Sequence, residues 1–232
     1  MLVEVPCTEN QVYRFDPTKT ALLVIDMQRD FCYPEGVGGI GGEDVGPLQK
    51  IIPKVEKLLV AARAANLLVI HTREGHTPDL STLHEMRRLS SFQAGAEIGV
   101  KGPMGRFLVR GEYGHDFVDG LYPQRNEIVI DKPGFSAFYK TDLESLLRDR
   151  GITHSIVCGV TTECCVQSTI RGAVDRGFFS LILSDCCASY YPDMHDATMR
   201  VLPAQGNLFG WVAKSTDLIP KLTAQDELSV VS

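Results

Sequence analysis

The chain has 232 residues, of which 44% are hydrophobic and 22% charged, and it carries a formal net charge of -6 at pH 7. These proportions are typical of a globular protein, and the excess of acidic residues disfavours nucleic acid as a partner, because such a partner requires a basic patch. No stretch has the length of a membrane span and the N-terminus lacks a signal-peptide pattern, so we expect a cytoplasmic protein with no membrane partner.

The first half of the chain predicts strands and helices in alternation after an extended arm over residues 1–18. A continuous apolar run over 20–25 is typical of a strand that is buried on both faces of a parallel sheet. Apolar residues at helical spacing predict an amphipathic helix over about 47–65, and residues 67–70 indicate a second buried strand. A strand, a helix and a strand in this order predict a right-handed crossover.

Residues 73–125 have the weakest periodicity and are rich in Gly, Arg, His and Pro, which is typical of a binding lid or an interface. The later predicted elements are a strand over 127–130, a helix from a capping box at Thr141–Glu144 to about Arg150, a strand over 154–158, a helix to Gly177, a strand over 178–183, a helix from about Asp193 to near Gly206, a strand over 209–213 and a helix over 216–222. We therefore expect an α/β fold, a three-layer α/β/α sandwich with a mostly parallel sheet, as one domain over residues 1–232.

The segment after the strand over 154–158 carries two adjacent thiols. It reads Gly159-Val160-Thr161-Thr162-Glu163-Cys164-Cys165-Val166, so a tight turn passes from a strand into a helix with both cysteines in the first turn. The N–H groups and partial positive charge of a helix start favour ionisation of a thiol and can hold an oxyanion. Cysteine is also commonly an inert buried residue, so this segment alone does not decide between the two roles.

Two charged residues follow other predicted strands in the same way. Asp26 ends the strand over 20–25, and Lys132 follows the strand over 127–130. Since ligands bind beyond the carboxyl ends of parallel strands, we expect both residues on the same sheet edge as Cys165. A carboxylate can accept the thiol proton and return it to a leaving amine, and an ammonium can lower the pKa of the thiol. Taken singly, Asp26 is better explained as a loop cap and Lys132 as a surface charge, but their shared placement favours a catalytic group.

Three segments resemble the signatures of the isochorismatase-like cysteine hydrolases. They are Val24–Gln28, Lys132–Ser136 with Phe138, and Gly159–Val166. The resemblance covers nearly all of residues 18–223 in the same order and spacing. It implies the fold expected above, a hydrolase activity and a homotetramer, since the family commonly forms tetramers.

The resemblance also implies the roles of individual residues. The family's catalytic triad falls on Asp26, Lys132 and Cys165. Its cis peptide falls between Val160 and Thr161, and its oxyanion hole on the backbone N–H groups of Cys164 and Cys165. Cys164 stands where the family usually has an aliphatic residue, so we expect it to pack rather than to react.

Within this family, the middle of the chain most resembles the ureide hydrolases that act on biuret and triuret. The matching segments are 71–80, 110–112, 185–187, 205–206 and 209–210. The resemblance implies an amidohydrolase that cleaves a C–N bond of a small linear ureide through a covalent Cys intermediate and releases ammonia. Gln205 would bind the substrate, because an amide matches the donors and acceptors of a ureide, and Phe31 would supply an apolar wall. Another small amide (a ureidoacrylate, nicotinamide or an N-carbamoyl compound) is the alternative substrate.

We expect no metal and no cofactor. The nicotinamidase branch of the family carries an Asp-x-His and a further His for a metal, whereas this chain has only Glu74-x-His76. The stretch Gly36–Gly41 matches G-x-G-x-x-G, the dinucleotide-binding pattern. It starts ten residues after the preceding strand, with Pro34 between, so a flexible loop is favoured over a nicotinamide oxidoreductase. Seven cysteines without a CxxC spacing predict neither a zinc ribbon nor a disulfide framework.

Two further alternatives remain open. His115 or His154 could pair with a cysteine as its base, although the placement of Lys132 makes a histidine base unnecessary. The chain could also be a non-catalytic scaffold of the same fold, which the loss of a triad residue would have favoured. All three triad residues are present in the sequence.

Overall fold

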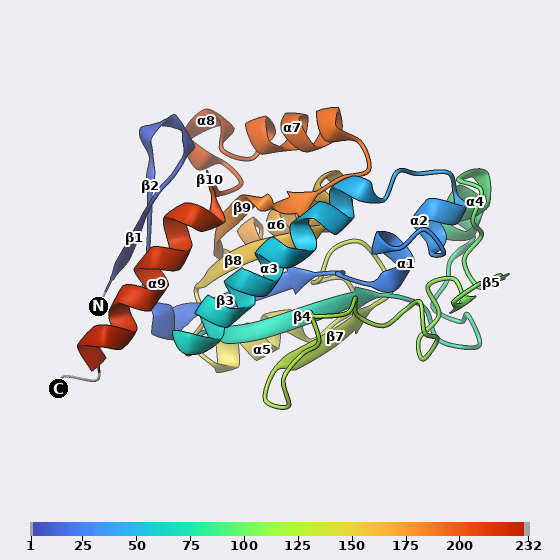
Figure 1. The fold of residues 1–232 in the computed structure, drawn as a ribbon, viewed down its shortest axis with the longest axis horizontal. Helices are drawn as coiled ribbons and strands as arrows, with labels where there is room; N and C mark the ends of the chain where they lie inside the picture. Colours follow the sequence, from blue (N-terminus) through green and yellow to red (C-terminus); the bar gives the residue numbers. More distant parts are fainter. Residues whose placement is uncertain (1, 230–232) are drawn as a thin grey trace.

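The computed structural model describes the backbone of residues 2–229 and the side chains up to Thr223. Its main feature is a sheet of six parallel strands in the order β10-β9-β8-β3-β4-β7 (Figure 1). The strands are β3 (Thr20–Ile25), β4 (Leu68–Glu74), β7 (Ile128–Lys132), β8 (His154–Val160), β9 (Phe179–Ala188) and β10 (Trp211–Ala213). All six strands point the same way, so their carboxyl ends meet at one edge of the sheet.

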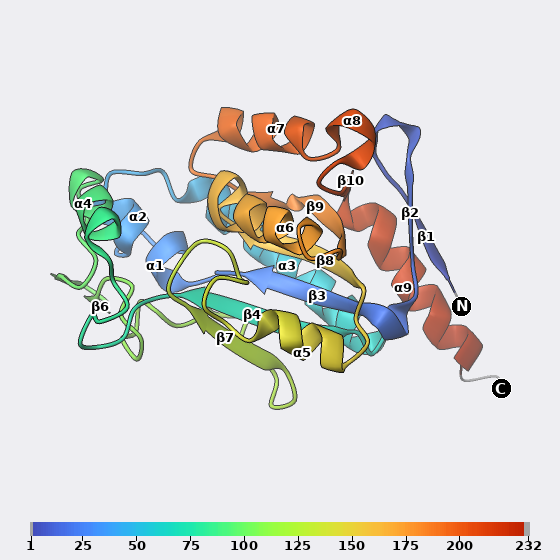
Figure 2. The ribbon, with the colours of Figure 1, turned by 180° about the vertical axis from the view of Figure 1, so that it is seen from behind.

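Helices cover both faces of this sheet. One face packs against α3 (Gly46–Ala64) and α9 (Ser215–Ser229), and the other packs against α5 (Leu143–Asp149), α6 (Gln167–Val174) and α7 (Pro192–Val201), as the two opposite views show (Figures 1 and 2). The three-layer α/β/α sandwich predicted from the sequence is therefore confirmed. None of the helices within residues 2–229 is long and apolar enough to cross a membrane.

The central strand β3 shows why the sheet is buried on both sides. Every residue of β3 is buried. Leu22 and Val24 point into the core beneath α3 and α9, whereas Ala21, Leu23 and Ile25 point into the opposite core. Side chains alternate between the two faces of a strand, so a continuous apolar run must serve two cores.

The N-terminal residues, predicted as an extended arm, form two paired strands. β1 (Val3–Pro6) and β2 (Val12–Phe15) form an antiparallel hairpin. In both strands, buried and exposed residues alternate, and the buried side chains of Val5 and Phe15 join the core beneath α9. This alternation is the pattern of a strand with one buried face.

Several predicted boundaries also differ from the structure. β4 continues through Glu74, because its polar residues such as Thr72 are buried and interrupt the apolar pattern without ending the strand. β8 continues through Val160. The capping box before α5 is not formed, since Asp142 is the N-cap without a side-chain bond and Glu144 pairs with arginines instead. The helix expected to reach Gly206 ends at Val201.

The long region between β4 and β7 and the glycine-rich stretch contain short elements. The first includes α4 (Glu85–Gln93) and a small hairpin of β5 (Lys101–Gly102) and β6 (Gly105–Arg106). The second contains α1 (Arg29–Cys32) and α2 (Val37–Ile40), so the flexible loop expected at Gly36–Gly41 is in part helical. A Cβ on Gly38 would lie 2.3 Å from the Tyr190 hydroxyl. The glycine there allows close packing, and α2 does not follow a strand directly as a dinucleotide site requires.

Candidate active site

The structure brings Asp26, Lys132 and Cys165 together at the carboxyl edge of the sheet. Asp26 follows β3, Lys132 ends β7, and Cys165 lies in the helix after β8. Lys132 Nζ lies 2.7 Å from Asp26 Oδ2, and both side chains are fully buried. Acceptor or thiol atoms of Asp26, Cys165 and a further residue, Glu74, all lie within 4.8 Å of one another. The three predicted residues, which are far apart in sequence, thus lie in one buried cluster together with Glu74.

The segment that carries Cys165 makes an unusual turn. The peptide bond between Val160 and Thr161 is cis, and a π-helix over Thr162–Val166 then leads into α6. A Cβ on Gly159, which has a φ of +118°, would lie 2.1 Å from the carbonyl oxygen of Ile25. Only glycine allows β8 to approach β3 this closely just before the turn.

The backbone N–H groups of Cys164 and Cys165 at the turn are those expected to form an oxyanion hole. The N–H of Cys164 donates to the carbonyl of Thr161 at 3.2 Å, so it is not free in this structure. Thr162 is buried, and its hydroxyl lies 2.8 Å from Nδ1 of His195 on α7. Contacts from a separate helix therefore help to fix the turn. The oxyanion role of the Cys164 and Cys165 N–H groups stays a prediction.

The Cys165 thiol is harder to ionise than its place at a helix start predicts. The neighbouring Cys164 side chain and burial both raise the pKa of Cys165 well above its usual range; Lys132 opposes them, and Asp26 adds to the increase. These contributions, of which the Cys164 side chain and burial are the largest, oppose the ionisation that the helix start would favour. A thiol in this setting must lose its proton as it reacts, so a nearby acceptor is required.

Asp26 and Lys132 have opposite tendencies. Burial raises the pKa of Asp26 above its usual value even though Lys132 lowers it. Burial lowers the pKa of Lys132, but the attraction of Asp26 and Cys165 outweighs this and raises it overall. Lys132 therefore stays an ammonium. Asp26 takes up a proton more readily than an ordinary aspartate does. Thr72 supports it by donating from Oγ1 to Asp26 Oδ1 at 2.6 Å.

Glu74 is the residue of this cluster that sequence reasoning missed. The Cys165 thiol donates to Glu74 Oε2 at 3.2 Å, and Arg87 of α4 donates to Glu74 Oε1 at 2.7 Å. Burial would raise the pKa of Glu74, but Lys132 and Arg87 together bring it down to about 2. The sequence signal for Glu74 is a carboxylate at the end of a sheet strand. It was missed because that strand was predicted to end at residue 70.

Comparison with known proteins identifies the family. The isochorismatase domain family matches residues 20–217. The chain belongs to this family. The structure is also similar to a cysteine hydrolase from Pseudomonas syringae pv. phaseolicola, with 29% sequence identity, a TM-score of 0.77 and coverage of 97% of this chain and 98% of the other. An isochorismatase family protein from Desulfovibrio vulgaris matches 91% of this chain and 98% of its own, with 27% identity and a TM-score of 0.70.

A third similar structure is the pyrazinamidase of Pyrococcus horikoshii in complex with zinc. It shares 27% identity with a TM-score of 0.66 and covers 84% of this chain and 99% of its own. We therefore tested whether Asp26, Glu74 and Cys165 could hold a metal here. The Lys132 ammonium lies 2.7 Å from Asp26 and 3.9 Å from Glu74, and Arg87 binds the other oxygen of Glu74. A cation would meet two positive groups, so this donor set does not fit a metal.

The proposed substrate-binding residues lie in different places. Phe31 is partly buried and lines a cavity of about 170 Å³ with Arg87, Leu108 and Tyr190. Gln205 is exposed on α8 (Ala204–Asn207), which lies beside the tip of the β1–β2 hairpin and beyond the far end of α7 (Figure 1). The structure thus places Phe31 near the cluster but does not bring Gln205 to it.

Arg87, which binds Glu74 of the cluster, also lines a second cavity. This cavity has a volume of about 470 Å³ and is lined by residues that include Arg87, Pro133, Phe135 and Tyr139. Pro133, in its wall, follows Lys132 directly in the chain. Arg87 lines both cavities, and its guanidinium lies 4.7 Å from the centre of the Phe135 ring.

The alternative histidine bases do not contact the thiol in the described side chains. His154 begins β8, at the opposite end of that strand from Cys165, and stacks on Phe179 at 4.9 Å between ring centres. His115 faces Asp131, with 3.8 Å between Nε2 and Oδ1, and burial lowers the pKa of His115 to about 4. The geometry therefore favours Asp26 or Glu74 over a histidine as the partner of Cys165.

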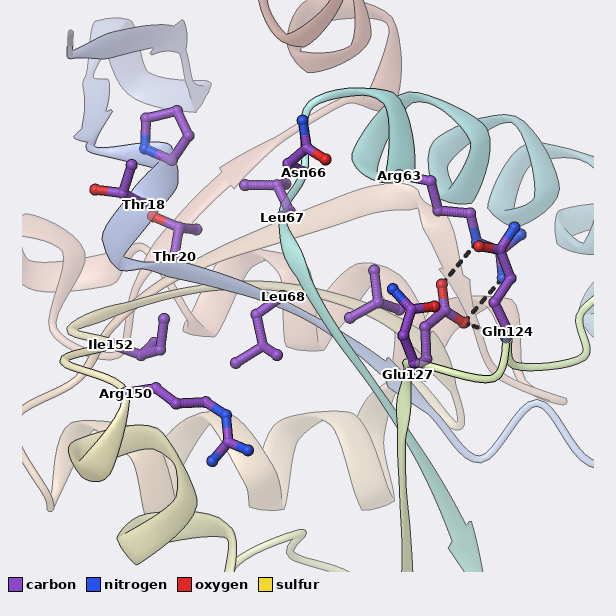
Figure 3. Close-up of a pocket in the computed structure, with 13 residues that line it drawn as sticks. Thr18, Thr20, Arg63, Asn66, Leu67, Leu68, Gln124, Glu127, Arg150 and Ile152 are labelled. Carbon is purple, nitrogen blue, oxygen red and sulfur yellow. Dashed lines mark hydrogen bonds and ion pairs between the residues drawn. The ribbon is translucent and has the colours of Figure 1, made fainter.

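Another hollow, of about 380 Å³, opens at the amino ends of β3 and β4 (Figure 3). Thr20 and Leu68, which begin these strands, lie in its wall. Two of its charges are paired with each other, because Arg63 donates to both oxygens of Glu127 at 2.7 and 3.0 Å. This hollow is at the opposite sheet edge from Cys165 and contains no thiol.

Proposed function

We propose that this protein is a cysteine hydrolase of small amides, with Cys165 as the nucleophile. One observation carries the proposal: a buried thiol lies beside two carboxylates and an ammonium at the carboxyl edge of a parallel sheet, just after a strand-to-helix turn. Nucleophilic catalysis requires this combination of an attacking group, a proton acceptor and fixed charges. Two similar proteins, a cysteine hydrolase and a pyrazinamidase, support the reaction class.

Asp26 carries the proton in the proposed reaction. As the sulfur of Cys165 bonds to the amide carbon, the thiol proton passes to Asp26 and the carbonyl electrons form an oxyanion at the turn. The C–N bond then breaks, and the departing nitrogen takes the proton from Asp26. Water attacks the resulting thioester-type intermediate, gives a proton to Asp26, and the C–S bond breaks to restore the thiol. Lys132 keeps its positive charge throughout and stabilises the negative groups.

The finer proposal is a small linear ureide, biuret or triuret, as the substrate. It rests on the resemblance of the middle segments described above and on the small volume of the cavity beside Phe31, about 170 Å³. Another small amide (a ureidoacrylate, nicotinamide or an N-carbamoyl compound) is the second candidate. All seven cysteines are free, which agrees with a reducing, cytoplasmic setting.

An ammonia-release screen tests this proposal. The purified chain is assayed with biuret, triuret, ureidoacrylate, nicotinamide and an N-carbamoyl amino acid, each at several concentrations. We expect the highest kcat/KM with biuret or triuret. Turnover of nicotinamide alone would keep the reaction class and reject the ureide, and no release from any amide would reject the function.

We also propose that the chain assembles as a homotetramer. Apolar side chains of α4, those of Met86, Leu89 and Phe92, are exposed in the single chain. Exposed apolar patches commonly mark protein–protein contacts. Light scattering should give a mass near four chains, and a monomer mass at micromolar concentration would contradict the assembly.

A further inference from the structure

We propose that Glu74 is a fourth functional residue of the site. Its carboxylate keeps Cys165 as a protonated, oriented thiol until the substrate is bound. Arg87 holds that carboxylate in place. The inference rests on the proposed function, because it assigns Glu74 a task in the attack by Cys165. It concerns a residue outside the Asp–Lys–Cys triad that the sequence resemblance implies.

The contacts of Glu74 separate its two oxygens. Oε2 accepts the Cys165 thiol at 3.2 Å, and Oε1 accepts Arg87 at 2.7 Å. The Glu74 side chain is 1% exposed, so water does not compete for either oxygen. The backbone is fixed as well, because Gln28 accepts from the Glu74 N–H at 2.7 Å and donates to its carbonyl at 3.0 Å. The carboxylate can therefore hold the thiol in one direction.

The charges around Glu74 decide what it can do with the proton. It faces Lys132 from β7, Arg87 from α4, Asp26 after β3 and His76 after β4. The pKa of Glu74 is held at about 2, so at neutral pH the carboxylate accepts the thiol hydrogen bond but does not keep the proton. The pKa of Asp26 is instead raised. We infer that Glu74 orients the S–H bond and opposes early ionisation, and that Asp26 receives the proton when the S–C bond forms.

Arg87 connects this carboxylate to α4 and to the two cavities that it lines. It comes from α4, lines both cavities beside the cluster, and lies over the Phe135 ring. A hydrogen bond between charged groups is stronger and more directional than one between neutral groups. The position of α4 is thus transmitted to the thiol through one salt bridge and one hydrogen bond.

The test compares activity with the reactivity of the thiol itself. In a Cys164→Ala background, Glu74→Gln removes the negative charge with little change of size. We expect kcat/KM to fall about 10- to 100-fold, as for the loss of a hydrogen bond to a charged group. Alkylation of Cys165 by iodoacetamide, followed by mass spectrometry, should instead become faster at neutral pH. Its pH midpoint should move down, because a negative neighbour that raises the Cys165 pKa is gone.

A matched variant separates charge from orientation. Glu74→Asp keeps the charge but shortens the reach, so kcat/KM should fall while the midpoint of alkylation stays high. Labelling of Cys158, which is fully buried, reports whether either variant has opened the core. Should Glu74→Gln fail to fold, Glu74→Asp and Arg87→Lys still test the proposal. Because Arg87→Lys keeps the positive charge, it should lower kcat/KM less than Glu74→Asp does.

The outcomes are distinct. The proposal is overturned if Glu74→Gln leaves both kcat/KM and the alkylation midpoint of Cys165 unchanged, or if the variant only increases labelling of Cys158. If wild type releases ammonia from no amide, the proposed function fails, but the alkylation profiles still show whether Glu74 controls the thiol. A downward shift of the midpoint with a loss of turnover supports both proposals.

Discussion

The two edges of the sheet each hold an ion-paired glutamate with a pKa of about 2, yet only one of them resembles a catalytic site. At the amino edge, Glu127 is bound by Arg63 and by His71, whose Nε2 lies 2.9 Å from Oε2. At the carboxyl edge, Glu74 is bound by Arg87 and by the Cys165 thiol. The comparison shows that an ion-paired glutamate alone does not identify a site.

The difference lies in what remains available for chemistry. Glu127 has its oxygens occupied by the Arg63 guanidinium, the His71 ring and the N–H of Gln124. At the other edge, a nucleophile takes part in the network, and Asp26 has a raised pKa beside a permanent ammonium. A network with a transferable proton can support a reaction, whereas a saturated one stabilises the fold.

The largest effect is expected from Cys165→Ser, which replaces the sulfur with little change of size. Turnover of the best amide should fall at least about a thousandfold, as when the nucleophile of a catalytic group is removed. The folded state should persist, as judged by circular dichroism and thermal melting. Cys164→Ala is the control and should keep substantial activity. If the two variants exchanged these outcomes, Cys164 would be the nucleophile and the arrangement described here would be wrong.

The next largest effect is expected from Asp26→Asn, which removes the proposed proton carrier. A general base commonly contributes about 10²- to 10⁴-fold, and kcat/KM should fall by that factor. In wild type, Asp26 must be ionised to accept the proton, and its pKa is raised above the usual 3.8. The kcat/KM should therefore decline on the acid side at a pH above that value. A pH profile with no such limb, or an active Asp26→Asn, would assign the proton transfer to another group.

Much of the fold could be predicted because its buried strands and longest helix have a regular apolar pattern. The run over 20–25 became β3, and the helix predicted over 47–65 became α3 (Gly46–Ala64). The positions of Asp26, Lys132 and Cys165 on one edge follow from parallel strands. The environment of the thiol could not be predicted, because the pKa of Cys165 depends mainly on the Cys164 side chain and on burial. Glu74, a further contributor, lies on a strand whose end was placed too early. Local pattern specifies elements, but pKa values depend on neighbours in space.

Gln205 tests whether the resemblance to ureide hydrolases extends to substrate binding. Its backbone has a φ of +55°, and its side chain is exposed on α8, away from the triad within this chain. If Gln205 binds a ureide, Gln205→Glu should lower kcat/KM roughly tenfold to a hundredfold, because a matched donor is lost, with little change in melting temperature. A lower melting temperature with normal kcat/KM would make Gln205 structural and would weaken the ureide proposal.

The smallest effect on activity is expected from Glu127→Gln, at the amino edge. Burial would raise the pKa of Glu127, but Arg63, the Gln124 N–H and His71 lower it from 4.5 to about 2. The stabilisation from this group is therefore complete above pH 4.5 and is lost as the pH falls toward 2. The variant should unfold more easily at neutral pH, by about 1–3 kcal/mol, and the difference from wild type should shrink on acidification.

The ammonia-release rate of folded Glu127→Gln should match that of wild type, while Glu74→Gln should lose activity. The two substitutions are chemically identical and remove carboxylates of similar pKa, so they isolate the effect of position. Urea unfolding at several pH values measures the first property, and kcat/KM measures the second. If Glu127→Gln lowered kcat/KM as much as Glu74→Gln does, charge at either edge would matter equally, and the contact with Cys165 would no longer explain why Glu74 is important.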